Sequence, residues 1–347
     1  MKITSKTFGT TDKGQAVQLF TLSNDHKITI SITNYGGIVT AVEVPDKDGN
    51  TDNIVCGFSK LEDYLNPVYL NNYPYFGALI GRFGNRIAKG KYTIDGTGYE
   101  GAINNGPNHL HGGLTGFDRR VWTPEIIEEK EKVSVKLSYL SPDKEEGYPG
   151  NLKVSCTYTL DNENNFSLVY EAETDKATII NLTNHTYFNL TGGKRDILDH
   201  ELELTADKIT ESADLIPTGK ILPVAGTAFD FTTRKKISKD LDQLPEGYDQ
   251  NFVLNEGGSS KPDYAGCLSE STTGRSVKVY TTQPGIQIYS GYWIPELTID
   301  GVKKFGKYSG LAMETQHFPD SPHHANFPST ILRPGETYLQ TTVFQLG

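Results

Sequence analysis

Alternation of apolar and polar residues with a period of two runs along most of this chain. The clearest run covers 152–160, where every second residue is apolar: Leu152, Val154, Cys156, Tyr158 and Leu160. Successive side chains of a β-strand point to opposite faces, so the run predicts a strand with one buried and one exposed face. Shorter runs with the same period lie at 28–32, 133–137, 277–279 and 286–288. The chain is therefore predicted to fold mainly from strands.

Turn-forming sequences separate these runs. The apolar residues Phe166, Leu168 and Tyr170 follow the run 152–160 across the polar segment DNENN. This pattern predicts a β-hairpin with one buried and one solvent-exposed face. Further turn segments are DKDGN at 46–50, SPDKEEGYPG at 141–150, NEGGSSKPD at 255–263 and RPGE at 333–336.

Evidence for helices is sparse. In SKLEDYLNP, Ser59 and Glu62 have the spacing of a capping box, and Pro67 is expected to end the segment. We predict one short helix there.

A length of 347 residues allows two domains or one large β domain. The strand runs continue over the whole chain without a linker or a sequence repeat, and the hydrophobic fraction of 36% is sufficient for a core. We therefore predict an all-β fold, a large antiparallel β-sandwich over residues 1–347 with a few short helices.

The charge and the cysteines exclude several classes. The net charge is −10 and the basic residues form no stripe, so nucleic acid and anionic membranes are not expected partners. No run of 18 apolar residues is present that would cross a membrane. The three cysteines are too widely spaced for a disulfide framework or a zinc knuckle, and MKITSKTFGTTDKG lacks the apolar core of a signal peptide. We expect a cytoplasmic protein.

The segment NLTNHTYFNL at 181–190 contains three Asn-X-Thr triplets, which are expected to stay unglycosylated in the cytoplasm. On a strand, Thr183, His185 and Tyr187 would share a face and offer a hydroxyl, an imidazole and a phenol to a polar ligand. The alternative is a core histidine that bonds to a backbone carbonyl.

The segment GRFGNR at 81–86 places Arg82 and Arg86 four residues apart, with Asn85 beside the second. The planar guanidinium suits bidentate recognition of hydroxyls or carboxylates. Two surface arginines in a turn are the alternative.

The segment NHLHGG at 108–113 has two histidines, His109 and His111, which would share one face of a strand. This spacing occurs in metal sites, but no carboxylate follows within a few positions. A histidine that handles a sugar or a proton is the favoured interpretation, and the metal interpretation stays open.

In GLAMETQHFPDSPHH at 310–324, Glu314 lies in an otherwise apolar strand. Burial of a carboxyl group is unfavourable unless the group is paired or used, and it raises the pKa toward that of an effective general base. Asp320, His323 and His324 lie in a Pro-containing loop and are expected to be solvated.

Taken together and in this order, these segments resemble the aldose 1-epimerase family. The motifs are GRFGNRIAKG, NHLHGG, GFDRRVW, NLTNHTYFNL, IPTGKI, FDF, YDQNFVL, YTTQPGIQIYSG, METQHFPD and LRPGETY. The resemblance implies a β-sandwich with a shallow sugar cleft that interconverts the α and β anomers of free aldoses such as galactose and glucose. It implies no cofactor, no metal and a small sugar as the partner, in a monomer or a homodimer.

The resemblance also implies roles for single residues. Glu314 matches the catalytic base, His185 the catalytic acid, and His111 a second histidine that orients the sugar or shares the acid role. For the acid role, a nearby carboxylate from Glu314 or Asp249 would favour the protonated form of His185. The residues that match sugar contacts are Asn85, Arg86, Asp249, Tyr187 and Gln283.

Position 250 departs from the family pattern, because Gln250 stands where many relatives have histidine.

Rival interpretations of the function are a hexose-6-phosphate epimerase, a glycosidase that uses Glu314 with Asp249, a sugar-binding sandwich without activity, and a metal enzyme.

Overall fold

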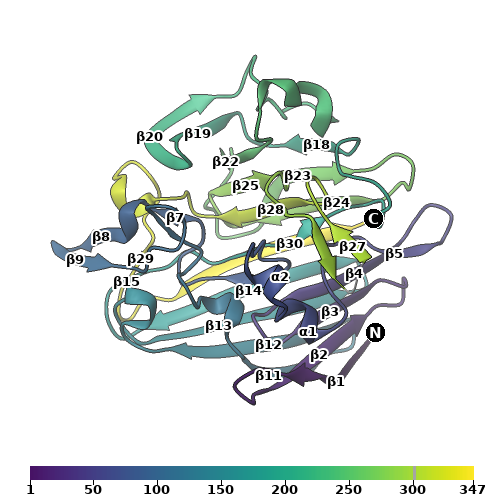
Figure 1. The fold of residues 1–347 in the computed structure, drawn as a ribbon, viewed down its shortest axis with the longest axis horizontal. Helices are drawn as coiled ribbons and strands as arrows, with labels where there is room; N and C mark the ends of the chain where they lie inside the picture. The colour runs from purple at the N-terminus through teal and green to yellow at the C-terminus, as the bar shows by residue number, and fades with distance from the viewer. Residues whose placement is uncertain (300–301) are drawn as a thin grey trace.

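The largest element of the structure is a twisted antiparallel sheet of nine strands (Figure 1). The computed structural model describes residues 1–299 and 302–347. In spatial order the strands are β11 (Thr123–Glu128), β12 (Lys132–Ser141), β13 (Leu152–Asp161), β14 (Asn165–Thr174), β30 (Tyr338–Leu346), β24 (Ser276–Thr281), β23 (Asp263–Ser269), β18 (Glu201–Leu204) and β21 (Lys235–Lys236).

Two further antiparallel sheets contribute to the fold. The six-stranded sheet has the order β17 (Tyr187–Phe188), β28 (Leu311–Gln316), β25 (Gly285–Tyr289), β22 (Asp249–Val253), β19 (Lys208–Ala213) and β20 (Ile216–Pro223). The five-stranded sheet has the order β1 (Lys2–Thr10), β2 (Ala16–Ser23), β3 (Thr29–Thr33), β4 (Val39–Pro45) and β5 (Thr51–Asn53).

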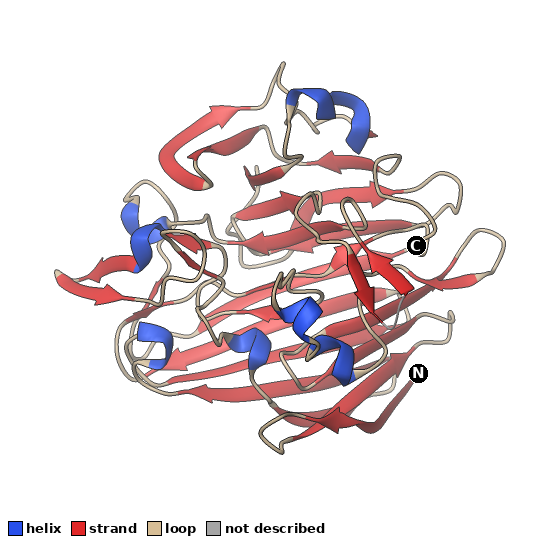
Figure 2. Ribbon diagram, viewed as in Figure 1, coloured by secondary structure: helices blue, strands red, loops and turns tan. Residues whose placement is uncertain are grey.

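Short strand pairs and helices complete the described residues, and Figure 2 shows how little helix there is. The pairs are β6 (Leu79–Ile80) with β16 (Thr183–Asn184), β7 (Arg86–Ile87) with β10 (His109–Leu110), β8 (Lys91–Ile94) with β9 (Thr97–Glu100), β15 (Thr178–Ile179) with β29 (Ile331–Leu332), and β26 (Leu297–Ile299) with β27 (Val302–Phe305). The helices are α1 (Leu61–Tyr64) and α2 (Pro67–Leu70), with 3-10 turns at Ala88–Gly90, Phe117–Arg119, Glu145–Gly147, Ile237–Gln243 and Ser321–His323. Within the described ranges, no helix has the length and apolar character needed to cross a membrane.

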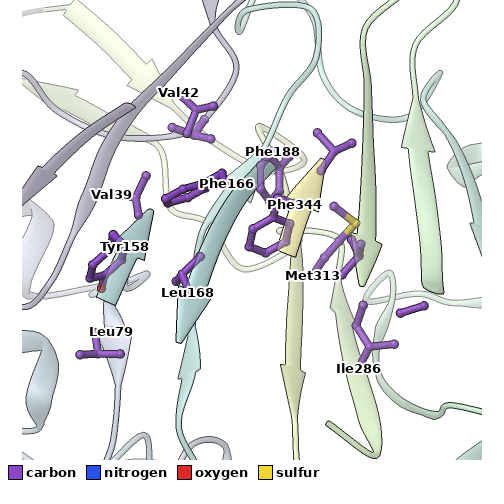
Figure 3. Packing of buried hydrophobic residues seen from close by; sticks show 14 of the residues in the cluster. Val39, Val42, Leu79, Tyr158, Phe166, Leu168, Phe188, Ile286, Met313 and Phe344 are labelled. Carbon is purple, nitrogen blue, oxygen red and sulfur yellow. The ribbon is translucent and has the colours of Figure 1, made fainter. Parts of the chain in front are cut away.

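The predicted alternation places the core between the sheets. Apolar residues from the inner face of the nine-stranded sheet contact those of both smaller sheets in one buried cluster (Figure 3). On the side of the six-stranded sheet, the rings of Phe344 and Phe188 lie 5.1 Å apart. On the side of the five-stranded sheet, the hydroxyl of Tyr158 donates to the carbonyl oxygen of Gly37 at 2.7 Å. The all-β sandwich expected from the sequence is confirmed.

Two local predictions meet different outcomes. The hairpin is confirmed, because β13 pairs with β14 in antiparallel register with Leu160 opposite Phe166. The short helix is confirmed as α1, but the capping box at Ser59 and the end at Pro67 are wrong. Lys60 occupies the N-cap of α1 without a side-chain cap, and Pro67 begins α2, where its missing N–H group removes no hydrogen bond. The side chain of Asn66 caps α2 by accepting from the Val68 N–H group.

The aromatic contacts of the core predict a large effect of truncation at Phe344. Its ring is 2% exposed and lies 6.3 Å from Phe166, so Phe344→Ala should lower the free energy of unfolding by about 3–5 kcal/mol in a urea titration. The matched control is Leu339→Ala on the other face of β30, where the side chain is 57% exposed and a change of about 0.5 kcal/mol or less is expected. Equal losses in the two variants would contradict the assignment of the faces.

Candidate active site

A pocket of about 330 Å³ opens beside the six-stranded sheet and contains most of the side chains selected from the sequence. Those that line it are Asn85, Arg86, His111, His185, Tyr187, Asp249 and Glu314. A larger hollow of about 610 Å³ lies on the outer face of the nine-stranded sheet, but its described lining contains no histidine. The smaller pocket is therefore the candidate active site.

The six-stranded sheet supplies the carboxyl groups of the pocket. On β28, Leu311 and Met313 point into the core, so Glu314 points to the opposite face, as the alternation predicts. Gln287 lies directly across from Glu314 on β25, and its Nε2 atom donates to Asp249 Oδ1 on β22 at 2.6 Å. The strand register thus brings two carboxyl groups that are 65 residues apart in sequence to one pocket.

The segment NLTNHTYFNL is not one strand. It forms β16, which pairs with β6, and β17, which pairs with β28, with His185 between them. The backbone of His185 donates to Ala78 O at 2.9 Å and accepts from Gly77 N at 3.0 Å. Because the pairing partner changes at His185, the expected common face is wrong: His185 and Tyr187 line the pocket, whereas Thr183 is buried and does not.

The segments GRFGNR and NHLHGG meet through the pair β7 and β10, where Arg86 lies opposite Leu110. Asn85 and His111 adopt left-handed backbone conformations, with φ of 63° and 50°. The chain therefore leaves the strand before His111, and the prediction that His109 and His111 share a face is wrong. His111 lines the pocket, whereas His109 is buried elsewhere, with its Nε2 atom 2.6 Å from the Tyr148 hydroxyl.

Two polar residues near the pocket have structural roles. Arg82 is 2% exposed and donates to the carbonyl oxygens of Pro149 and Gly150 at 2.8 and 3.1 Å, so it is not a surface arginine.

The expectation that Asp320 is solvated is wrong. Asp320 is 2% exposed and accepts from the Ala88 N–H group at 2.8 Å, which fixes the segment after Arg86. A short polar side chain that satisfies a buried backbone donor explains why this aspartate lies inside.

The central pair of the pocket consists of His185 and Glu314. The distance from His185 Nε2 to Glu314 Oε1 is 3.5 Å, and both side chains are almost fully buried. Burial raises the pKa of Glu314 well above its usual range; the Asp249 charge raises it further, and Arg86 opposes. Burial lowers the pKa of His185 to about 3. In the sugar-free site desolvation is the largest influence on His185 and favours its neutral form.

His111 presents a hydrogen-bond donor to the pocket. Its Nδ1 atom accepts from the Asn85 N–H group at 3.1 Å, and burial lowers its pKa well below the usual range. A neutral imidazole whose Nδ1 accepts a hydrogen bond carries its hydrogen on Nε2.

This tautomer also bears on metal binding. One donor atom each of His111, His185 and Glu314 lies within 4.8 Å of the others, a spacing compatible with a metal ion. A metal needs a lone pair from each ligand, whereas His111 offers an N–H group at Nε2. The donor set is therefore poorly suited to a metal.

The structure places two of the remaining sequence candidates outside the pocket. Gln283 lies where the chain crosses from β24 in one sheet to β25 in another, and it is fully buried. Its side chain bonds to His317 Nδ1 at 2.8 Å and to the Tyr338 hydroxyl at 3.2 Å. Gln250 lies on the face of β22 opposite Asp249 and donates to Thr210 O, so the departure from the family pattern is outside the pocket.

Sequence reasoning missed several residues of the pocket. Gln287 bonds to Asp249, and Tyr75, Asn105 and Tyr289 line the pocket wall. The alternation around Ile286 and Ile288 already placed Gln287 on the face opposite to the core, a usable signal. No comparable signal marked Tyr75, which lies in a loop.

A β-sandwich with a buried carboxyl–imidazole pair in a polar pocket has the organisation of an enzyme that works by proton transfer. The model of the family "Aldose 1-epimerase" matches residues 18–345. Galactose mutarotase of Sus scrofa is 42% identical over 99% of this chain and 98% of its own, and aldose 1-epimerase of Escherichia coli is 35% identical over 96% of each chain. The crystal structure of galactose 1-epimerase from Lactobacillus acidophilus superimposes with a TM-score of 0.86 at 30% identity, covering 100% of this chain and 98% of that one. The chain belongs to the aldose 1-epimerase family and is an enzyme that epimerises sugars, as the sequence motifs predicted.

The raised pKa of Glu314 predicts a pH-dependent gain in stability for Glu314→Gln. The folded protein favours the protonated carboxyl group, so this contribution is fully present below the unfolded pKa near 4.5 and is lost as pH rises toward the folded pKa. Glutamine does not titrate. The variant should therefore match the wild type near pH 4 and exceed it increasingly above pH 5, by up to about 1.4 kcal/mol per pH unit. Urea titrations at several pH values test this, with Glu125→Gln on an exposed position as the control. A difference that does not depend on pH would contradict the shift.

Proposed function

We propose that this protein is a mutarotase, which interconverts the α and β anomers of free aldohexoses such as galactose and glucose. The observation that carries the proposal is the buried pair of His185 and Glu314, 3.5 Å apart in a polar pocket. The proposal is supported by the relatives named galactose mutarotase, whose sequences align with this one over nearly the whole chain.

Mutarotation requires a limited set of bond changes. The C1 hydroxyl loses a proton, the ring oxygen gains one, and the bond between C1 and the ring oxygen breaks to give the open aldehyde. Rotation about the bond between C1 and C2 followed by reclosure gives the other anomer. One group that accepts a proton and one that donates a proton are sufficient.

In our proposal Glu314 takes the proton of the C1 hydroxyl and His185 protonates the ring oxygen. Burial disfavours the charged form of both groups in the sugar-free site. The pair is therefore neutral, and its one proton lies on Glu314. Moving that proton to His185 creates an ion pair without taking a proton from solvent. Arg86 favours the ionised carboxylate, and hydroxyl groups of a bound sugar would solvate it further. On reclosure the two residues exchange roles.

The remaining residues of the pocket are proposed to hold the sugar. Arg86 Nε donates to Asn105 Oδ1 at 3.0 Å, which orients the guanidinium and leaves its terminal nitrogens for sugar hydroxyls. Asp249 uses one oxygen for Gln287, and the other is assigned to a hydroxyl. Asn85 and Tyr187 line the same space. His111, as a neutral donor, orients the sugar rather than acting as the acid.

The proposed roles predict a specific kinetic loss. Glu314→Gln and His185→Gln should each lower kcat for freshly dissolved α-D-galactose by about 10²–10⁴-fold, because each removes a proton-transfer step. Polarimetry gives kcat, and calorimetric titration of galactose shows whether sugar still binds.

The control for these variants is Glu125→Gln. The surface variant should behave like the wild type, since Glu125 is exposed on β11. Near wild-type acceleration by Glu314→Gln would remove Glu314 as the base. Sugar binding without acceleration by the wild type would identify a non-catalytic sugar-binding protein instead.

The charges of the pocket also predict discrimination against phosphorylated sugars. Arg86 is the one lysine or arginine among the described lining residues, and Arg82 is already bonded to backbone carbonyls. A phosphate group would meet Asp249 without a second cation to balance it. We expect kcat/KM for galactose 6-phosphate to be at least about tenfold below that for galactose. A preference for the phosphorylated sugar would instead support a hexose-6-phosphate epimerase.

A further inference from the structure

The wall of the pocket above the two histidines is formed by the loop that follows α2. Tyr75 from this loop contacts both rings. Its ring centroid lies 5.8 Å from that of His185, with an interplanar angle of 24°, and 4.8 Å from that of His111. Tyr187 is a second aromatic ring beside His185, at 4.8 Å and 34°. His185 is thus flanked by two phenol rings at shallow angles.

The loop is also bonded to the backbone of His185. Gly77 N donates to His185 O at 3.0 Å, and His185 N donates to Ala78 O at 2.9 Å. Asn184 Nδ2 donates to Gly77 O at 3.0 Å. Any displacement of residues 75–78 would therefore shift the imidazole together with its backbone.

Tyr75 occupies an unfavourable backbone conformation, with φ of 58°. Bulky residues rarely adopt the left-handed region, and such strain persists only where the surroundings hold the residue in place. Residues of this kind concentrate at functional sites, so the position of Tyr75 needs a structural explanation.

A second tyrosine of the same loop anchors Tyr75. The ring of Tyr73 is 4.4 Å from that of Tyr75, and the Arg119 guanidinium lies 4.3 Å from the Tyr73 centroid. Arg119 Nε is in turn 3.5 Å from Asp118 Oδ2. Burial raises the pKa of Asp118 to about 6, and Arg119 opposes this shift. The Arg119 guanidinium thus contacts both the Tyr73 ring and the Asp118 carboxyl group.

We propose that Tyr75 is a positioning residue for His185 and His111, and that its ring stabilises the protonated imidazole of His185 while the anchor of Tyr73, Asp118 and Arg119 holds it in place. The face of an aromatic ring attracts a cation within about 6 Å, and more strongly in a desolvated site. The consequence for catalysis rests on the proposed mutarotase function. The interaction of the Tyr75 ring with His185 does not depend on that function.

The groups that face His185 show why an aromatic ring matters there. Glu314 favours the imidazolium through its carboxyl group, 3.5 Å away, but only when that group is ionised. Asp249 raises the pKa of Glu314, whereas Arg86 lowers it. His111 and Arg86 lie on the other side, and a positive charge on either disfavours a second one in the pocket. The rings of Tyr75 and Tyr187 stabilise the cation without adding a net charge.

The test compares Tyr75→Leu with Tyr75→Phe. Tyr75→Phe keeps the ring and should retain kcat within about twofold, whereas Tyr75→Leu should lower kcat about tenfold with KM changed less than about threefold. In the sugar-free protein, NMR titration of the His185 ring proton should show the acid-side midpoint of Tyr75→Leu about half a pH unit below that of the wild type. His185→Gln assigns the resonance.

A control and a second variant complete the test. Tyr264→Leu removes a tyrosine from β23, far from the pocket lining, and should leave kcat and the His185 titration unchanged. Tyr73→Leu removes the ring that contacts Tyr75 and Arg119 and should lower kcat in the same direction by a smaller factor, so the proposal stays testable if Tyr75→Leu does not fold.

Two results would overturn the proposal. Wild-type kcat and titration in Tyr75→Leu, or in Tyr73→Leu when Tyr75→Leu does not fold, would show that the loop does not position the histidines. A raised KM at constant kcat would assign Tyr75 to sugar binding instead. Absence of mutarotation in the wild type with every aldose tested would refute the proposed function, while the NMR titration would still decide whether Tyr75 acts on His185.

Discussion

Burial of Glu314 beside His185 is the interaction on which the rest of the site depends. Both groups lose hydration in the fold, and each would be unfavourable as an isolated charge. Because His185 Nε2 and Glu314 Oε1 are 3.5 Å apart, the two groups can share one proton. The pair is neutral while the proton is on Glu314, as in the sugar-free site, and would be an ion pair with the proton on His185. Because desolvation raises the pKa of Glu314 and lowers that of His185, the proton is held on Glu314 in the sugar-free site.

The β-sandwich makes this burial possible because it uses both faces of the six-stranded sheet. Met313 packs against the core on one face of β28, while Glu314 faces the pocket on the other. Neighbouring strands then place Gln287 and Asp249 on the pocket side by register alone. Loops supply what the sheet cannot: Arg86, His111 and Tyr75 come from segments with short strands or left-handed residues. The sheet thus fixes the carboxyl groups, and the loops approach them from the other side.

Period and register explain what could be predicted from the sequence. The strands, the hairpin of β13 and β14, and the direction of Glu314 follow from alternation, which depends only on neighbouring residues. The errors arose where the pairing partner changes or the backbone turns. Thr183 and His185 do not share a face because the chain leaves one sheet for another, and His109 and His111 do not because His111 is left-handed.

Buried polar groups were the second source of error. Gln283 and Asp320 looked like a sugar contact and a solvated residue, yet both satisfy internal hydrogen bonds. The distinction depends on distant partners such as His317 and Ala88, which no local pattern reveals. The family resemblance added Asp249 to the pocket residues that residue chemistry had singled out, but it also supplied Gln283, which lies outside the pocket.

The face of the sheet that carries Glu314 has hydrogen-bonding capacity that the described protein leaves unused. Several buried side-chain atoms on this face have no hydrogen-bond partner within the described protein, among them Glu314 Oε2, Gln287 Oε1, Asn251 Oδ1 and both terminal atoms of Gln316. Buried polar groups are usually satisfied, so a cluster with unused capacity is uncommon. Gln287 is opposite Glu314 in the register, and Gln316 follows it on the same face of β28. Most of these atoms are acceptors, because the amide nitrogens of Gln287 and Asn251 already donate to Asp249 Oδ1 and Thr210 Oγ1. Of the atoms named here, Gln316 Nε2 is the only donor. A face with so many acceptor oxygens favours a protonated Glu314 over a carboxylate, in the same direction as the raised pKa of Glu314.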